Sequence, residues 1–101
     1  MTHALLSSAA RRDLLEAMRW ITKDNPSAAG ALRHGVSKAA VIVGAHPNVG
    51  SLHPELVNAL YRCLALTGFP FVIIYHAERR PPLTVGILHG ARDLSEVLRD
   101  H

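Results

Sequence analysis

The spacing of the apolar residues changes once along this chain. In the first half, apolar residues recur every three or four positions, the period of a helix with one buried face, at Ala10, Leu14, Met18 and Ile21. In the second half, short apolar runs follow one another with turn-like residues between them, as the strands of a sheet do. Helices first and strands afterwards is the pattern of an α+β fold.

The first half predicts two helices joined as an antiparallel hairpin. A short strand at residues 4–6 precedes a helix that begins at Ser8, with Ser7 or Ser8 as its N-cap, and ends near Asp24. The pair Asn25-Pro26 is predicted to begin the second helix, because asparagine caps helices and proline favours the first helical position.

The second helix is predicted to continue to about Gly44. Apolar residues keep the helical spacing through this segment, at Ala29, Leu32, Val36, Ala40 and Val43. The stretch that follows, AHPNVGSLHPE, contains two prolines and a glycine and predicts a loop.

Three strands are predicted after this loop, at Leu60–Leu66, Phe71–His76 and Thr84–His89. The short connections TGFP and AERRPP favour an antiparallel meander, with the apolar run FVIIY as the central strand. A short C-terminal helix is expected in DLSEVLRD, with Asp93 as its N-cap and Leu94, Val97 and Leu98 as its apolar edge. Two helical turns are unstable alone in water, so this helix must dock on something.

The length of 101 residues indicates a single domain, residues 1–101, with a small core that a permanent partner would enlarge. A lone cysteine, Cys63, excludes an internal disulfide framework and suits the reducing cytoplasm. No apolar stretch is long enough for a membrane span, so no membrane association is expected. Residues 1–54 contain six basic and three acidic residues, whereas residues 55–101 contain five of each.

Seven histidines raise the question of a metal site, and we predict none. His46 and His53 flank the loop without a second ligand at helical spacing, and metal ions need several ligands that converge. Cys63 lies within an apolar strand, where thiols are usually inert. Neither a nucleotide-binding motif nor a hydrolase motif is present, and no cofactor is predicted.

Titratable residues gather at the predicted strand ends. If the strand registers match, His76 and His89 are the last residues of two adjacent rows of apolar side chains. Arg62 lies in the third strand, and Arg79 and Arg80 lie at a nearby turn. Such a set can bind phosphate or transfer protons, since histidine titrates near neutral pH. The alternative is that these histidines are half-exposed strand ends and Asp93 caps the last helix.

Trp20 falls outside the apolar stripe of the first helix, beside Asp13 and Glu16. Two interpretations are open. The indole covers the second helix, or it stays exposed as an anchor for a partner.

Four segments in order resemble the ParE/RelE superfamily of bacterial type II toxins. LLSSAARRDLLEAMRWITKDNPSAAGAL is similar to the opening of that superfamily, and HPNVG to its loop after the second helix. FPFVIIYHAE resembles its central strand, and VGILHGARDL resembles its last strand and the segment that follows it. The resemblance implies a β-α-α-β-β-β fold, with the helical hairpin packed on a small antiparallel sheet.

The resemblance also implies a cognate antitoxin, a ParD-like DNA-binding protein that wraps the toxin in a hetero-oligomer. The toxin would then meet DNA only through this partner. We expect the antitoxin to contact apolar residues of the first and last helices, namely Leu14, Leu15, Met18, Trp20, Leu94 and Leu98.

The superfamily contains two functional branches. RelE-like members are metal-independent, ribosome-dependent mRNA endonucleases, for which this chain offers Arg62, His76, His89 and Arg92. However, its C-terminal half has no lysine, and no tyrosine follows its last strand. ParE-like members poison DNA gyrase and have no established catalytic residues. The segment LHGARDL, at the end of the last predicted strand and just after it, resembles theirs.

We therefore favour a gyrase-directed toxin, with Arg79, Arg80, His89 and Arg92 as expected target contacts. The mRNA endonuclease is the alternative. A degenerate toxin that acts only as a co-repressor with its antitoxin is a third reading, and it predicts that the free protein is harmless.

Overall fold

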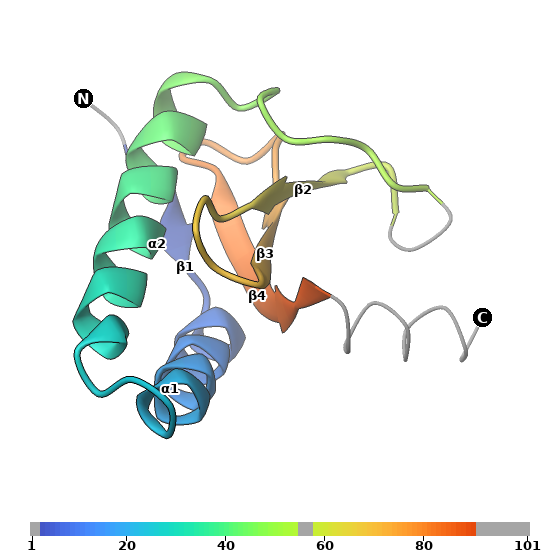
Figure 1. Ribbon diagram of the computed structural model, residues 1–101. Helices are drawn as coiled ribbons and strands as arrows, with labels where there is room; N and C mark the ends of the chain where they lie inside the picture. Colours follow the sequence, from blue (N-terminus) through green and yellow to red (C-terminus); the bar gives the residue numbers. More distant parts are fainter. Residues whose placement is uncertain (1–2, 55–57, 91–101) are drawn as a thin grey trace.

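The computed structural model describes residues 3–54 and 58–90, which form two helices and a four-stranded sheet (Figure 1). The elements are β1 (Leu5–Leu6), α1 (Ser8–Thr22), α2 (Ala28–Ala45), β2 (Tyr61–Ala65), β3 (Phe71–His76) and β4 (Leu83–His89). This order confirms the predicted β-α-α-β-β-β arrangement. The predicted C-terminal helix, with Asp93, Leu94 and Leu98, lies outside the described residues.

Helix α1 begins as its sequence predicts. Ser7 is the N-cap, and its Oγ accepts a hydrogen bond from the backbone N–H of Ala10 at 3.0 Å. This bond satisfies one of the amide groups that have no partner within the first turn of a helix.

The predicted start of the second helix at Asn25-Pro26 was wrong, because α2 begins at Ala28. The carbonyl of Asn25 accepts from the N–H of Ala28 at 3.0 Å, and its Oδ1 accepts from the hydroxyl of Ser27 at 2.8 Å. Asn25 therefore closes a turn before the helix instead of capping it. Ser27 occupies the N-cap position, but its side chain makes no capping hydrogen bond to the first turn of α2.

The sheet has the strand order β1-β4-β3-β2. Strands β2, β3 and β4 form the expected antiparallel meander, while the short β1 runs parallel to β4 and makes the sheet mixed. Strand β3 lies inside the sheet and is its most buried strand, as predicted.

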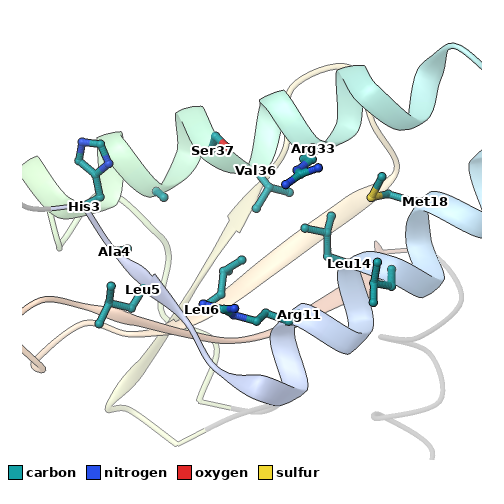
Figure 2. Close-up of a pocket in the computed structure, with 12 residues that line it drawn as sticks. His3, Ala4, Leu5, Leu6, Arg11, Leu14, Met18, Arg33, Val36 and Ser37 are labelled. Atoms are coloured by element: carbon teal, nitrogen blue, oxygen red, sulfur yellow. The ribbon is translucent and has the colours of Figure 1, made fainter.

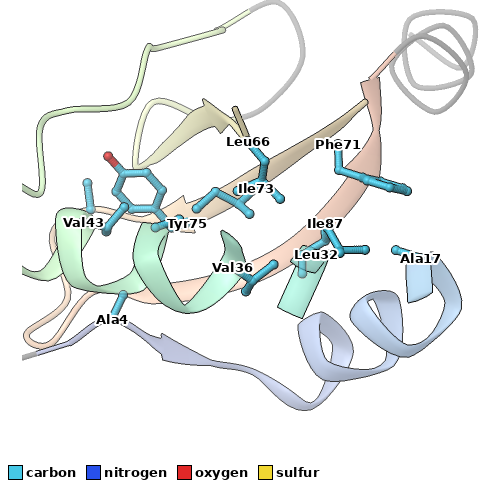
Figure 3. Packing of buried hydrophobic residues seen from close by; sticks show 12 residues of the cluster. Ala4, Ala17, Leu32, Val36, Val43, Leu66, Phe71, Ile73, Tyr75 and Ile87 are labelled. Carbon is cyan, nitrogen blue, oxygen red and sulfur yellow. The ribbon is translucent and has the colours of Figure 1, made fainter. Parts of the chain in front are cut away.

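The core lies between the helices and one face of the sheet (Figure 3). Leu32, Val36 and Val43 of α2 face Ile73 and Tyr75 of β3, and all five are buried. A buried leucine, valine or isoleucine contributes about 1.5–3 kcal/mol relative to an exposed one. These residues therefore contribute to holding α2 on the sheet, and Ala17 of α1 and Ile87 of β4 extend the same core.

The register of β3 and β4 overturns the expected meeting of His76 and His89. His89 pairs with Phe71 at one end of the ladder, and His76 pairs with Leu83 at the other end. In an antiparallel pair, the last residues of the two neighbouring strands lie at opposite ends of the ladder. The two histidines therefore do not form one cluster.

A bulge between β3 and β4 also changes which face Val85 occupies. Tyr75 pairs with Thr84, while Ile74 pairs with Gly86, so Val85 has no direct partner on β3. One extra residue in a strand interrupts the simple alternation of faces. The predicted row of Val85, Ile87 and His89 on one face is therefore broken at Val85.

Candidate partner-binding surface

A groove of about 620 Å³ lies between the two helices and the first strand (Figure 2). It is lined by His3, Ala4, Leu5 and Leu6 around β1, by Arg11, Leu14, Leu15 and Met18 of α1, and by Arg33, Val36, Ser37 and Ala40 of α2. Most of its lining is apolar, and Leu5 and Leu15 are each 55% exposed. Exposed leucines of this kind mark a surface suited to a protein partner.

Three of the predicted antitoxin contacts, Leu14, Leu15 and Met18, line this groove together. They share it because positions 14, 15 and 18 follow the helical period and point to one side of α1. Leu94 and Leu98 lie outside the described residues. The sequence therefore identified the apolar residues of the α1 wall of the groove but not its other walls.

Arg11 and Arg33 were missed as groove residues. Each occupies a position on the same helical stripe as its apolar neighbours, since Arg11 precedes Leu15 by four residues and Arg33 precedes Val36 by three. The helical spacing was therefore a usable signal, although only the apolar positions of each stripe were considered.

Trp20 does not belong to the groove, and neither interpretation of its role fits fully. Its ring lies edge-on to Phe71 and to His89, with centroid separations of 6.0 Å and 4.9 Å. It therefore covers one end of the sheet rather than α2, and it remains 37% exposed. Asp13, Glu16 and these three aromatic residues line a hollow of about 100 Å³.

The loop that contains HPNVG is fastened to the sheet by Tyr75 and Arg62. The buried Tyr75 hydroxyl accepts from the N–H of Gly50 at 2.8 Å and donates to the carbonyl of Pro47 at 2.7 Å. Arg62 Nη1 donates to the carbonyl of Gly50 at 2.8 Å. Burial raises the pKa of Tyr75 above its ordinary value, and the Gly50 bond and the Arg62 charge offset part of this rise.

The three described residues expected for nuclease chemistry, Arg62, His76 and His89, are not brought together. Arg62 faces the helices beside Tyr75 and binds loop carbonyls, whereas His76 and His89 lie at opposite ends of the sheet. Arg92 lies outside the described residues. The His76 ring instead lies edge-on to Tyr61, with centroids 5.3 Å apart.

The expected target contacts are divided in the same way. Arg79 and Arg80 are exposed in the turn between β3 and β4, near His76, while His89 is at the far end of β4. Nη1 of Arg80 donates to the carbonyls of Ala77 and Arg79, so this guanidinium folds back on its own turn.

Within residues 3–54 and 58–90, no three His, Cys, Asp or Glu side chains are grouped so that they could hold a metal ion. Over the same residues, no helix is both long and apolar enough to cross a membrane.

Comparisons with known proteins identify the family to which this fold belongs. The family model described as the ParE toxin of the type II toxin-antitoxin system, parDE, matches residues 4–94. No curated protein matches the chain. The fold is similar to a solved structure described as the chromosomal ParDE TA system from P. aeruginosa, with a TM-score of 0.72 and 18% identity over 88% of this chain and 96% of that one. Because the family model spans nearly the whole chain, this protein belongs to the ParE toxin family of type II toxin-antitoxin systems.

Proposed function

We propose that this toxin arrests growth by poisoning DNA gyrase and is not itself a nuclease. The observation that favours a gyrase poison over an mRNA endonuclease is the separation of His76 and His89, which lie at opposite ends of the sheet. A general acid and a general base must both reach one phosphodiester at hydrogen-bond distance. Arg62 Nη1 also donates to the loop carbonyl of Gly50, which holds this side chain against the loop.

The gyrase contact that we propose is the turn between β3 and β4. Arg79 is exposed there, and within the described residues its guanidinium makes no hydrogen bond or ion pair. Arginine suits contacts with carboxylates and phosphates, both of which a gyrase–DNA complex presents. His89 is a weaker contact candidate, because Trp20 and Phe71 pack against its ring.

This proposal is tested by expressing the toxin without its antitoxin and following DNA and protein synthesis by pulse labelling. Gyrase poisoning predicts DNA breaks and an early stop in DNA synthesis, with protein synthesis declining later. An early stop in protein synthesis with intact DNA would support the endonuclease instead. Normal growth, with the folded protein present, would support the degenerate toxin.

We also propose that the groove receives an amphipathic segment of a ParD-like antitoxin. The groove is open and apolar, and Leu15 on its wall is 55% exposed. An amphipathic helix buries its apolar side in such a groove. The complex would be a hetero-oligomer in which the antitoxin, and not the toxin, contacts DNA.

Leu15→Glu tests this docking, because it places a charge on the groove wall where the partner's apolar side would lie. We expect the variant to lose co-purification with the cognate antitoxin. Leu52→Glu is the matched control, since Leu52 is 48% exposed in the loop after α2 and does not line the groove. Equal loss in both variants, or in neither, would contradict groove docking.

A further inference from the structure

Two guanidinium groups flank the groove from opposite helices. Arg11 lies on α1 and Arg33 on α2, and both belong to the groove lining (Figure 2). No aspartate or glutamate lines this groove. Across the described ranges, neither guanidinium takes part in an ion pair or a side-chain hydrogen bond. The groove therefore combines an apolar floor with two positive charges that the toxin itself does not balance.

The stability of the fold does not explain this placement. Arg11 ends the first turn of α1, which contains no acidic residue. The N-terminus of a helix carries a partial positive charge, so a cation there is unfavourable. Both arginine side chains also remain exposed, so neither contributes to the buried core. An anionic occupant of the groove would pair with both charges.

We infer that Arg11 and Arg33 select the occupant of the groove by the charge that it carries. This inference rests on the proposed docking of an antitoxin segment. The occupant is an amphipathic helical segment whose apolar side fills the groove and whose two flanks carry carboxylates, one opposite each arginine. Arginine binds a carboxylate through two parallel hydrogen bonds, which fixes orientation as well as charge. A segment with neutral or basic flanks fits the same groove but leaves both guanidinium groups unpaired.

Three synthetic peptides test this inference. They share one apolar helical face and differ only at the flanking positions, which are all Glu, all Gln or all Lys. Binding to the purified toxin is measured by fluorescence anisotropy near physiological salt. Two exposed ion pairs predict that the Glu peptide binds roughly tenfold more tightly than the Gln peptide. The Lys peptide should bind most weakly, and the preference should shrink as salt is raised.

Charge reversal of the two arginines supplies the decisive comparison. Arg11→Glu combined with Arg33→Glu should reverse the order, so that the Lys peptide binds best. Arg12→Glu combined with Lys38→Glu is the matched control, because it changes net charge equally on the same helices at exposed positions outside the groove. This control should keep the wild-type order. A second variant, Arg11→Gln with Arg33→Gln, should bind the Glu and Gln peptides equally.

Three results would overturn the inference. Equal binding of the Glu and Gln peptides to the wild type would show that charge does not select the occupant, while groove docking itself would stand. Reversal by the control to the same degree as by Arg11→Glu with Arg33→Glu would show that only net charge matters. If none of the three peptides binds, both the inference and the groove docking fail. The gyrase proposal is independent of all these measurements, which contain no gyrase.

Discussion

At the scale of single residues, Tyr75 and Gly50 determine how the long loop after α2 meets the sheet. Tyr75 is fully buried, and its hydroxyl bonds to the backbone of Pro47 and Gly50. A Cβ at position 50 would lie 2.8 Å from that hydroxyl and 2.9 Å from the carbonyl oxygen of Cys63. Glycine is therefore required there by close packing.

Gly50→Ala should accordingly destabilise the protein by about 1–3 kcal/mol, because the added methyl group overlaps both atoms. Gly30→Ala is the opposite case, since nothing lies within 4 Å of a Cβ at this exposed helical position. It should stabilise the protein by about 0.5–1 kcal/mol. Urea unfolding measures both changes, and a Gly50→Ala variant as stable as the wild type would refute the packing argument.

The buried hydroxyl of Tyr75 also predicts a pH dependence. Its pKa is raised in the folded state, mainly by burial, so the folded protein retains this proton at a pH where the unfolded chain releases it. The resulting stability is present below pH 10 and is lost as the pH rises further. Tyr75→Phe should remove this part of the alkaline loss, and Tyr61→Phe should retain it. Identical stability profiles above pH 10 for the wild type and Tyr75→Phe would contradict this assignment.

At the scale of elements, α1 completes the edge of β4 where β1 ends. Strand β1 pairs only with Leu83 and Thr84, so the N–H of Ile87 has no strand partner on that side. Asp13 of α1 supplies the missing acceptor, because Asp13 Oδ2 accepts a hydrogen bond from the N–H of Ile87 at 3.0 Å. One carboxylate therefore ties the first helix to the last strand.

Asp13→Ala should cost about 1–3 kcal/mol, because it leaves a partly buried amide without an acceptor. Asp13→Asn retains an acceptor oxygen and should recover most of this loss. Thermal unfolding of the two variants separates them. Equal destabilisation by both would indicate that the charge, and not the hydrogen bond, is the stabilising contribution.

The elements themselves were predictable, whereas their pairing was less so. Periodicity identified both helices and the three longer strands, because burial of one face imposes a fixed spacing on the apolar residues. The register of β3 and β4 depends on a bulge beside Tyr75 that no sequence pattern marks. That bulge explains the position of Val85, whereas His76 and His89 are apart because antiparallel neighbours finish at opposite ends of their ladder, as the predicted meander already implied. The bonds from Arg62 to the carbonyls of Asn48 and Gly50 join segments that are apart in the sequence and leave no local pattern.

At the scale of the whole molecule, the proposed antitoxin and gyrase contacts use different surfaces. The groove lies between the helices and β1, whereas Arg79 lies in the turn between β3 and β4. Neither Arg79 nor Arg80 lines the groove. We therefore expect the two binding activities to be separable by mutation.

Arg79→Ala should weaken the effect on gyrase by about tenfold or less, as expected for one exposed charge, and leave binding of the Glu-flanked peptide unchanged. Arg19→Ala, which removes an exposed arginine from α1, is the control and should alter neither. Titration of each variant in a gyrase supercoiling reaction measures the first effect. Loss of peptide binding in Arg79→Ala would contradict the separation of the two surfaces.

The central claim is that the free toxin converts gyrase into an agent that breaks DNA. The most direct measurement is a supercoiling reaction with purified gyrase, relaxed plasmid and antitoxin-free toxin, stopped with detergent and treated with protease. We predict linear plasmid that accumulates with toxin dose and remains linked to gyrase before the protease step. Normal supercoiling with no linear product, from toxin that still binds the Glu-flanked peptide, would contradict the claim and direct attention to the ribosome.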